Sequence, residues 1–219
     1  MVTFEQVKNS QEINTYISQA DAILNAIGYT EHAHAHMNTC VAVVEYILEE
    51  LGYDERTVEL AKIAAYMHDI GNVINRADHA QSGAVMAFRI LDKMGMDPKD
   101  NAEVISAIGN HDEKTAYPVN ALAAALILGD KTDVRRSRVR KDAKISEDIH
   151  DRVNYAVEKS NVVLDIDNKE IELILKVDSN ICAVMEYFEI FLDRMLLCSK
   201  AAEYFGLHFR LNINGSVLL

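Results

Sequence analysis

The sequence predicts a mainly α protein, in which a helical bundle over residues 1–155 precedes a small β-β-α-β lobe over residues 156–219. Only two of the 219 residues are proline, so long helices can form without interruption. After residue 155 the apolar residues change from a helical period to the alternation of strands. Glycines that would close successive helices in a left-handed conformation follow the apolar segments at Gly28, Gly52, Gly71 and Gly95.

The bundle is expected to consist of consecutive helices. After a first helical stretch that Gly28 ends, the expected helices cover residues 31–51, 54–71, 78–91, 101–109 and 120–130. In the first of these, His36, Cys40 and Ile47 recur at the spacing of one helical face. Asp78 and Gln81 have the spacing of a capping box, which predicts the start of the helix over 78–91.

The C-terminal lobe is predicted from alternating apolar residues. The expected strands cover 162–167, 170–176 and 208–213, and a helix over 180–204 precedes the last of them. A lobe of this size can bury little surface by itself, so we expect it to pack on the bundle or on a second copy of the chain.

A homodimer through this lobe is one expectation, in which the lobe supports self-association rather than chemistry. It holds no clustered histidines, and its hairpin offers an edge strand. Its helix carries residues that could form an apolar association face, Tyr187, Phe188, Phe191 and Met195. Simple packing on the bundle is the alternative.

Composition excludes several classes of protein. The formal charge of −12, from 34 acidic and 22 basic residues, argues against coating polymeric nucleic acid. Three cysteines without a C-x-x-C pair support neither a disulfide framework nor a cysteine zinc site. The first residues contain no apolar leader, and the apolar run Ala121–Gly129 is too short to span a bilayer. We therefore expect a cytoplasmic protein without a membrane segment.

Histidine and aspartate placement predicts a metal site. A single inward-facing histidine is usually a hydrogen-bonded core residue, but here histidines and aspartates recur at successive helix ends. These residues are His36, His68, Asp69, His79, His111 and Asp130. Neutral imidazole and carboxylate suit Mn, Fe, Zn or Ni, and helical bundles build metal sites from facing helices.

The segment Ala64-Ala65-Tyr66-Met67-His68-Asp69-Ile70-Gly71 resembles the HD-domain metal-dependent phosphohydrolases, and the resemblance extends over about residues 30–135. It implies an HD-type helical bundle with a basic metal-binding set of His36, His68, Asp69 and Asp130. His79 and His111 match the additional histidines of members that hold two metals. The implied cofactor is one or two divalent transition metal ions (Mn, Fe, Ni, Co or Zn), with Asp69 bridging them where two are bound.

Two positions qualify the resemblance. His36 lies 16 residues before Gly52, the usual interval in this family, whereas His32 lies one turn earlier and could support a metal ligand or contact substrate. Position 72 is Asn72, where the family commonly has lysine. If that lysine contacts phosphate, its role is lost or moves to Arg76 or Lys131.

A run of basic residues directly follows Asp130. It comprises Lys131, Arg135, Arg136, Arg138, Arg140 and Lys141. Charge runs are usually solvated, but guanidinium groups also bind phosphate in bidentate fashion. Its position beside Asp130 favours phosphate contacts for Lys131 and Arg135. Cys40, one turn after His36, is expected in the core rather than as a ligand.

The predicted function is that of a metal-dependent phosphohydrolase cleaving a phosphate ester or anhydride, with a small phosphorylated substrate such as a nucleotide as the resemblance implies. The expected catalytic residues are Asp69, His79 and His111, and the expected phosphate contacts are Lys131, Arg135, Arg76 and His32. Two alternatives remain open. One is a non-catalytic protein that senses nucleotides, and the other is an RNA phosphodiesterase that uses the arginine run.

Overall fold

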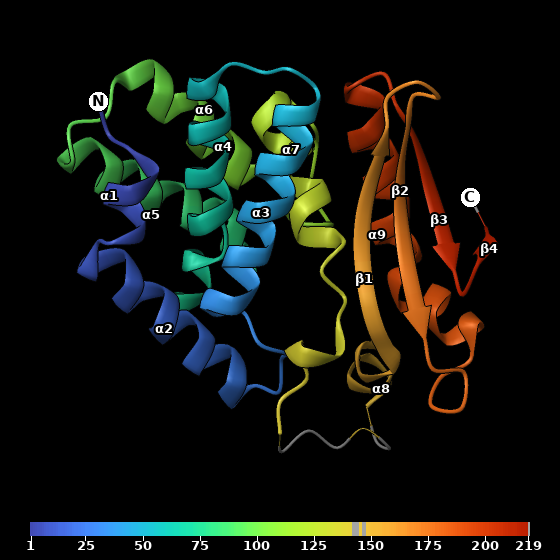
Figure 1. Cartoon of the computed structure of the whole chain (residues 1–219). Coiled ribbons are helices and arrows are strands. Elements are labelled where there is room, and N and C mark those ends of the chain that lie inside the picture. Colours follow the sequence, from blue (N-terminus) through green and yellow to red (C-terminus); the bar gives the residue numbers. More distant parts are fainter. Residues whose placement is uncertain (142–144, 146–147, 219) are drawn as a thin grey trace.

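The computed structural model describes residues 1–141, 145 and 148–218 and places a helical part beside a smaller part made of a sheet and helices (Figure 1). The helices of the first part are α1 (Phe4–Lys8), α2 (Gln11–Ala26), α3 (His34–Glu50), α4 (Glu55–Met67), α5 (His79–Lys93), α6 (Pro98–Gly109) and α7 (Ala121–Lys131). Short 3₁₀ turns follow two of them, η1 (Ile70–Val73) after α4 and η2 (Arg136–Arg138) after α7. The predicted mainly α fold class is confirmed.

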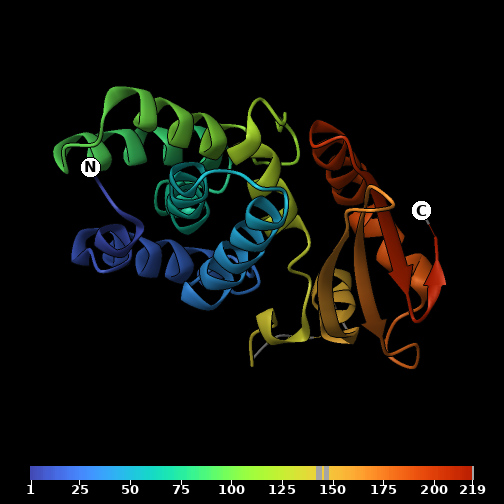
Figure 2. The ribbon, with the colours of Figure 1, turned by 45° about the horizontal axis from the view of Figure 1, so that its top comes forward.

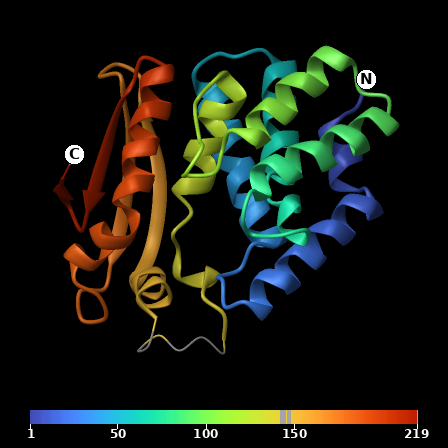
Figure 3. The ribbon, with the colours of Figure 1, turned by 180° about the vertical axis from the view of Figure 1, so that it is seen from behind.

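The C-terminal part contains a sheet with one long helix against it, as Figure 3 shows from behind. Its elements are α8 (Ile149–Ala156), β1 (Val157–Asp165), β2 (Glu170–Val177), α9 (Val184–Tyr204), β3 (His208–Ile213) and β4 (Ser216–Val217). The strands lie in the order β1-β2-β3-β4, and β2 pairs in parallel with β3 because α9 crosses between them. The division of the chain between residues 155 and 156 stays a prediction.

Helix α7 lies between the two parts (Figure 2). All of its residues are buried, as expected for a helix that is apolar on every side. Gly129 lets α7 approach α3 closely, because a Cβ there would lie 3.0 Å from the Cys40 carbonyl oxygen. Ile127 and Leu128 of α7 belong to the core beneath the sheet, so this helix joins both parts. Within the described chain, every helix is too short or too polar to cross a lipid bilayer.

The structure corrects the expected association face. Tyr187, Phe191 and Met195 are buried in the core of the C-terminal part, because α9 packs on α7 and on the sheet. The outer edge of β1 is also engaged, since the Leu164 backbone N–H donates to the Tyr46 hydroxyl at 3.1 Å. The homodimer stays a prediction, but the aromatic face expected to support it is wrong at Tyr187, Phe191 and Met195, and Phe188 is half-buried.

Two of the expected helix signals, Gly71 and Asp78, have a different structural basis. Gly28, Gly52 and Gly95 do have positive φ angles, of 85°, 74° and 82°. Gly71 instead lies in η1, where a Cβ would be 2.0 Å from the His79 carbonyl oxygen. Asp78 is not the cap of a capping box, because its φ of 56° turns the chain into α5 while its side chain makes no cap hydrogen bond with a described residue.

Replacing Gly71 tests whether this close approach of η1 and α5 holds the fold together. Gly71→Ala should lower the free energy of unfolding by about 3 kcal/mol or more, because backbone atoms must move to admit the methyl group. Urea denaturation measures the change. Gly109→Ala is the matched control, since its Cβ would make an ordinary 3.7 Å contact with Ala84. An equal loss in both variants would contradict the steric explanation.

Candidate metal centre

Six ligand-type side chains meet at the ends of several helices, and all six are buried. They are His36 in the first turn of α3, His68 and Asp69 directly after α4, His79 at the start of α5, His111 just beyond α6, and Asp130 near the end of α7. We call these residues the buried cluster. The structure brings together every residue that the sequence suggested as a metal ligand.

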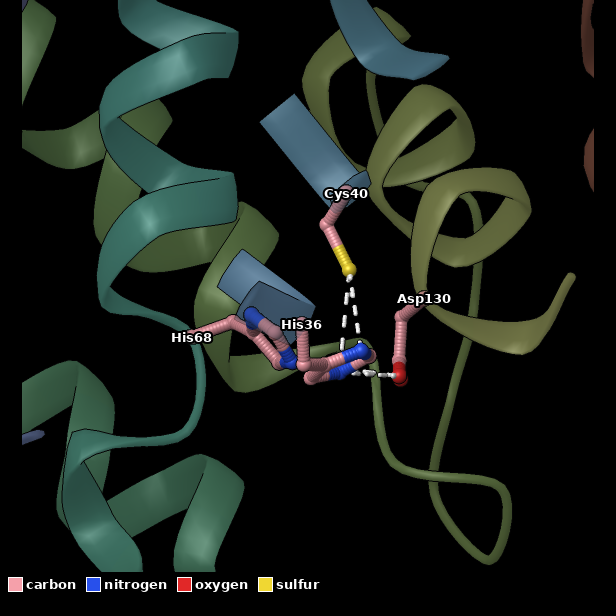
Figure 4. Close-up of side chains that lie close together, drawn as sticks. All are labelled: His36, Cys40, His68 and Asp130. Atoms are coloured by element: carbon pink, nitrogen blue, oxygen red, sulfur yellow. Dashed lines mark hydrogen bonds and ion pairs between the residues drawn. The ribbon is translucent and has the colours of Figure 1, made fainter. Parts of the chain in front are cut away.

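The two carboxylates lie among the histidine rings (Figure 4 shows His36, Cys40, His68 and Asp130). His36 Nε2 is 3.3 Å from Asp130 Oδ1, and His68 Nε2 is 3.4 Å from Asp69 Oδ2. On the other side, Asp69 Oδ1 is 3.4 Å from His79 Nε2 and 3.9 Å from His111 Nε2. Asp69 is therefore the acidic group shared by both halves of the buried cluster.

Each ring is oriented through its Nδ1 atom. The His36 Nδ1–H donates to Asp133 Oδ2 at 2.7 Å. The other three rings donate from Nδ1 to backbone carbonyl oxygens, His68 to Ala65 at 2.8 Å, His79 to Arg76 at 3.1 Å and His111 to Ile108 at 2.6 Å. Carbonyl and carboxylate oxygens only accept, so Nδ1 must carry the proton. In the neutral ring Nε2 then bears the lone pair, and all four Nε2 atoms lie beside Asp69 or Asp130, with Arg76 Nη1 also 3.2 Å from that of His79.

The lone pairs fit a bound cation. His68 Nε2 is buried without a hydrogen-bond partner in the described part of the chain, which is costly for a polar atom. The Nε2 atoms of His79 and His111 are 3.2 Å apart, although in neutral rings neither has a proton to share. Potential ligand atoms lie within 4.8 Å of one another in two overlapping groups, His36-Cys40-His68-Asp130 and His68-Asp69-His111. This donor set suits one or two divalent transition metal ions.

Electrostatics keep the carboxylates ionised. Burial opposes their charge, but His68 outweighs it and holds the pKa of Asp69 well below its usual range. Lys131 does the same for the pKa of Asp130. Burial raises the pKa of the Cys40 thiol, and Asp130 raises it further. The Cys40 thiol, 3.6 Å from both His36 ring nitrogens, is therefore held in its protonated form.

Two functional positions were not identified from the sequence. Asp133 is buried and orients His36, and it also pairs with Arg135, whose Nε is 2.8 Å from Asp133 Oδ1. Asn72 donates from Nδ2 to Asp69 Oδ1 at 2.8 Å, so it orients Asp69 where a lysine was expected. Asp133 lies beyond the end of α7 at Lys131, so no helical spacing relates it to Asp130.

A pocket of about 360 Å³ opens onto the buried cluster. Asp69, His79 and Asp130 line it, together with Tyr29 from the segment before α3. The C-terminal part, expected to serve association rather than chemistry, also lines it through Asn154 of α8 and through Phe191 and Arg194 of α9. The pocket therefore lies between both parts of the chain.

Three of the four expected phosphate contacts line this pocket: His32, Arg76 and Lys131. Lys131 Nζ is 2.6 Å from Asp130 Oδ2, and the Arg76 guanidinium lies 5.4 Å from the centre of the Tyr29 ring. The expected position of Arg135 is wrong, because Arg135 lines a separate hollow beside Thr39. The chain is no longer helical there, so residues after α7 face in different directions and Arg138 reaches the pocket instead.

Comparison with known proteins gives a family match. The model of the family described as HD domain matches residues 34–157, more than half of the chain and all of the buried cluster. An uncharacterized protein from Methanocaldococcus jannaschii is 25% identical over 211 residues, covering 85% of this chain and 80% of that protein. A crystal structure of a predicted HD superfamily hydrolase from an uncultured Thermotogales bacterium is 28% identical, with a TM-score of 0.46, and covers 57% of this chain and 68% of that chain.

The orientation of His36 by Asp133 predicts an effect on metal binding. Asp133→Asn removes the charge that makes His36 a more basic donor, so the dissociation constant for Co²⁺ should rise by about 10-fold or more. Competition against a chelating indicator measures this constant. Asp92→Asn, at an exposed position of α5, is the control and should leave it unchanged. A change below twofold in Asp133→Asn would contradict this role.

Burial of neutral histidines predicts that the metal-free protein is acid-sensitive. Burial is the main cause that lowers the pKa values of His32, His79 and His111. Below pH ~6.5 the unfolded chain binds protons at these sites that the folded chain does not, so the free energy of unfolding should fall as the pH falls. Burial lowers the pKa of His68, but the neighbouring Asp69 outweighs it and raises this pKa, so His68 contributes in the opposite sense and offsets part of the slope.

Urea denaturation in EDTA at pH 6.5 and 5.5 measures this slope, to which each histidine contributes at most ~1.4 kcal/mol per pH unit. His111→Gln should make the slope shallower. His208→Gln, at the exposed start of β3, should leave it unchanged. An identical slope in the parent and His111→Gln would show that burial of His111 is not linked to proton binding.

Proposed function

The chain belongs to the HD domain family of metal-dependent hydrolases, and from this we propose that it cleaves a phosphate ester or anhydride in a small phosphorylated substrate. We propose a nucleotide as the substrate class. One or two divalent transition metal ions would be held by the residues of the buried cluster. Asp69 would contact both positions if two ions are bound, because it lies beside histidines of both halves.

The observation that carries this proposal is the direction of the four imidazole rings. Their Nδ1–H groups are used by Asp133 and by three backbone carbonyls, which leaves the Nε2 lone pairs pointing at Asp69 and Asp130. A cluster that served only to pack the core would satisfy His68 Nε2 with a donor, but this atom accepts no hydrogen bond from a described residue and instead faces the Asp69 and Asp130 carboxylates at 3.4 and 3.8 Å. A divalent metal lowers the pKa of water toward ~7 and offsets charge on phosphoryl oxygens.

The chain's own residues would bind and orient the phosphate group. Lys131 lies beside Asp130, and Arg76 lies 3.9 Å from Asp69 Oδ1, so both cations stand at the mouth of the buried cluster. Arg76 Nη1 also donates to Asn72 Oδ1 at 3.3 Å, and this places a guanidinium near the position of the missing lysine. This contact supports moving the role of that lysine to Arg76.

The rest of the pocket supports a substrate of nucleotide size. Its volume of about 360 Å³ falls in the range of small-molecule sites. The rings of Tyr29 and Phe191 line it, with the guanidiniums of Arg76 and Arg194 against them at 5.4 and 4.6 Å. The exposed ring of Tyr29 can stack on a base, whereas phosphate alone would need only the cations.

Replacing Asp69 tests the proposed hydrolysis. Asp69→Asn keeps the shape of the side chain but removes the negative charge that lies between His68 and His79. With Mn²⁺ present, the turnover of bis(p-nitrophenyl) phosphate and of a panel of nucleotides should fall by at least ~10²-fold. Circular dichroism must first show that the variant is folded, and Asp92→Asn is the control of equal charge change.

Two results would contradict the proposal. If Asp69→Asn hydrolyses substrate at the parental rate, Asp69 has no part in the reaction. If the parent hydrolyses nothing with Mn²⁺, Fe²⁺, Ni²⁺ or Co²⁺ yet binds nucleotides in calorimetry, the chain is a nucleotide sensor rather than a hydrolase.

A further inference from the structure

We propose that Arg138 binds a second anionic group of the substrate, a phosphate or a carboxylate, apart from the phosphate that meets the buried cluster. The inference rests on the proposed function, because both concern one substrate in one pocket. It adds a requirement that the proposed function does not contain. The substrate must carry two anionic groups, and the second must reach the wall of the pocket that Arg138 forms.

The distribution of charge in the pocket singles out Arg138. Four cationic side chains line the pocket, Arg76, Lys131, Arg138 and Arg194. Three of them have a carboxylate nearby, in the pairs Arg76–Asp69 at 3.9 Å, Lys131–Asp130 at 2.6 Å and Arg194–Glu113 at 2.5 Å. Among the residues that the structure describes, no carboxylate lies within 4.0 Å of the Arg138 guanidinium. Within the described ranges, Arg138 is thus the pocket cation whose charge is not offset by an ion pair.

The guanidinium of Arg138 is held by main-chain oxygens. Its Nε donates to the Glu31 carbonyl at 3.0 Å, and its Nη1 donates to the Asp133 carbonyl at 2.7 Å. The side chain is buried, with 4% exposed. Its remaining nitrogen, Nη2, makes no hydrogen bond with any residue in the described ranges. The Asp133 carboxylate is taken by other donors, since His36 and Arg135 bind its oxygens at 2.7 and 2.8 Å.

This arrangement favours an anion as the partner of Nη2. A buried cation without an ion pair is costly, and a ligand carboxylate or phosphate would supply the missing charge. The two carbonyl contacts fix the plane of the guanidinium before the ligand arrives, so little ordering of the side chain is needed on binding.

The contacts of Arg138 with the main chain do not by themselves explain a charged side chain. They tie the segment before α3 to the segment after α7, and the Glu31 backbone N–H strengthens this tie by donating to the Arg138 carbonyl at 2.8 Å. A glutamine could provide a side-chain donor for one of these carbonyls without bringing a charge into the pocket. Arg138→Gln therefore separates the anion-binding role from much of the structural one.

The test uses three probes on one three-carbon frame with the Mn²⁺-loaded full-length protein. They are the non-hydrolysable phosphonate analogues of glycerol 3-phosphate, 3-phosphoglycerate and glycerol 1,3-bisphosphate, which carry one phosphonate, one phosphonate with a carboxylate, and two phosphonates. Titration calorimetry at constant ionic strength should show that the parent binds at least one doubly anionic probe about 10-fold more tightly than the first. Which of the two gains more identifies the second anion.

Arg138→Gln should abolish this difference and bind the singly anionic probe within about twofold of the parent. Arg138→Lys keeps the charge and should recover part of the difference. The control is Arg89→Gln, an exposed arginine of α5, which should behave as the parent. Thermal unfolding checks that each variant is folded.

The outcomes separate this inference from the proposed function. If the parent does not prefer either doubly anionic probe, or if Arg138→Gln keeps the preference, Arg138 does not bind a second anion and the proposed hydrolysis is unaffected. If Arg138→Gln weakens all three probes equally, Arg138 acts through the structure of the pocket, which also overturns the inference. If the parent binds none of the probes, the inference is overturned, because the pocket then holds neither anionic group, and the hydrolysis of nucleotides by the parent and Asp69→Asn decides the proposed function separately.

Discussion

The buried cluster depends on how helix ends satisfy their own backbone. The last carbonyls of a helix have no partner within it. At the end of α4, the Nδ1–H of His68 donates to the carbonyl three residues earlier and so gives it a partner. His111 does the same at the end of α6. The hydrogen bond that completes each helix therefore also directs Nε2 of the ring inward. Helix termination and the direction of the lone pairs are one structural feature, and the geometry of the site follows from where the helices stop.

This explains which parts of the site could be predicted from the sequence. Histidine and aspartate at successive helix ends were recognisable, because helix length is visible in the apolar period and the glycines that follow it. Asp133 and Arg138 were not, since α7 ends at Lys131 and a helical period no longer relates later residues to Asp130. Gly71 was recognised as a special position for the wrong reason. Its backbone φ was expected to require glycine, whereas the requirement comes from α5, which begins at His79 and packs its backbone against Gly71.

The C-terminal part shows a related limit of sequence analysis. The amphipathic pattern of α9 correctly distinguishes an apolar face, but it does not say what covers that face. In the structure Tyr187 and Phe191 meet the sheet and α7, so the face is internal. The same packing brings Arg194 to the pocket and places it beside Glu113, which lies 3.9 Å from Lys131 Nζ. A lobe that the sequence separates from the chemistry is thus connected to it through side chains on α7 and α9.

Helix α7 links the packing of the C-terminal part to the charge of Asp130 in the buried cluster. Asp130 lies at the C-terminal end of a fully buried helix, where the helix dipole disfavours a negative charge. Lys131 and His36 offset that cost, with contacts of 2.6 and 3.3 Å to the Asp130 carboxylate. Lys131 in turn is buried by the packing of the C-terminal part on α7, which keeps water from screening its charge. The two parts of the chain therefore stabilise the site jointly, because the sheet and α9 maintain the low-dielectric surroundings in which Lys131 holds Asp130 ionised.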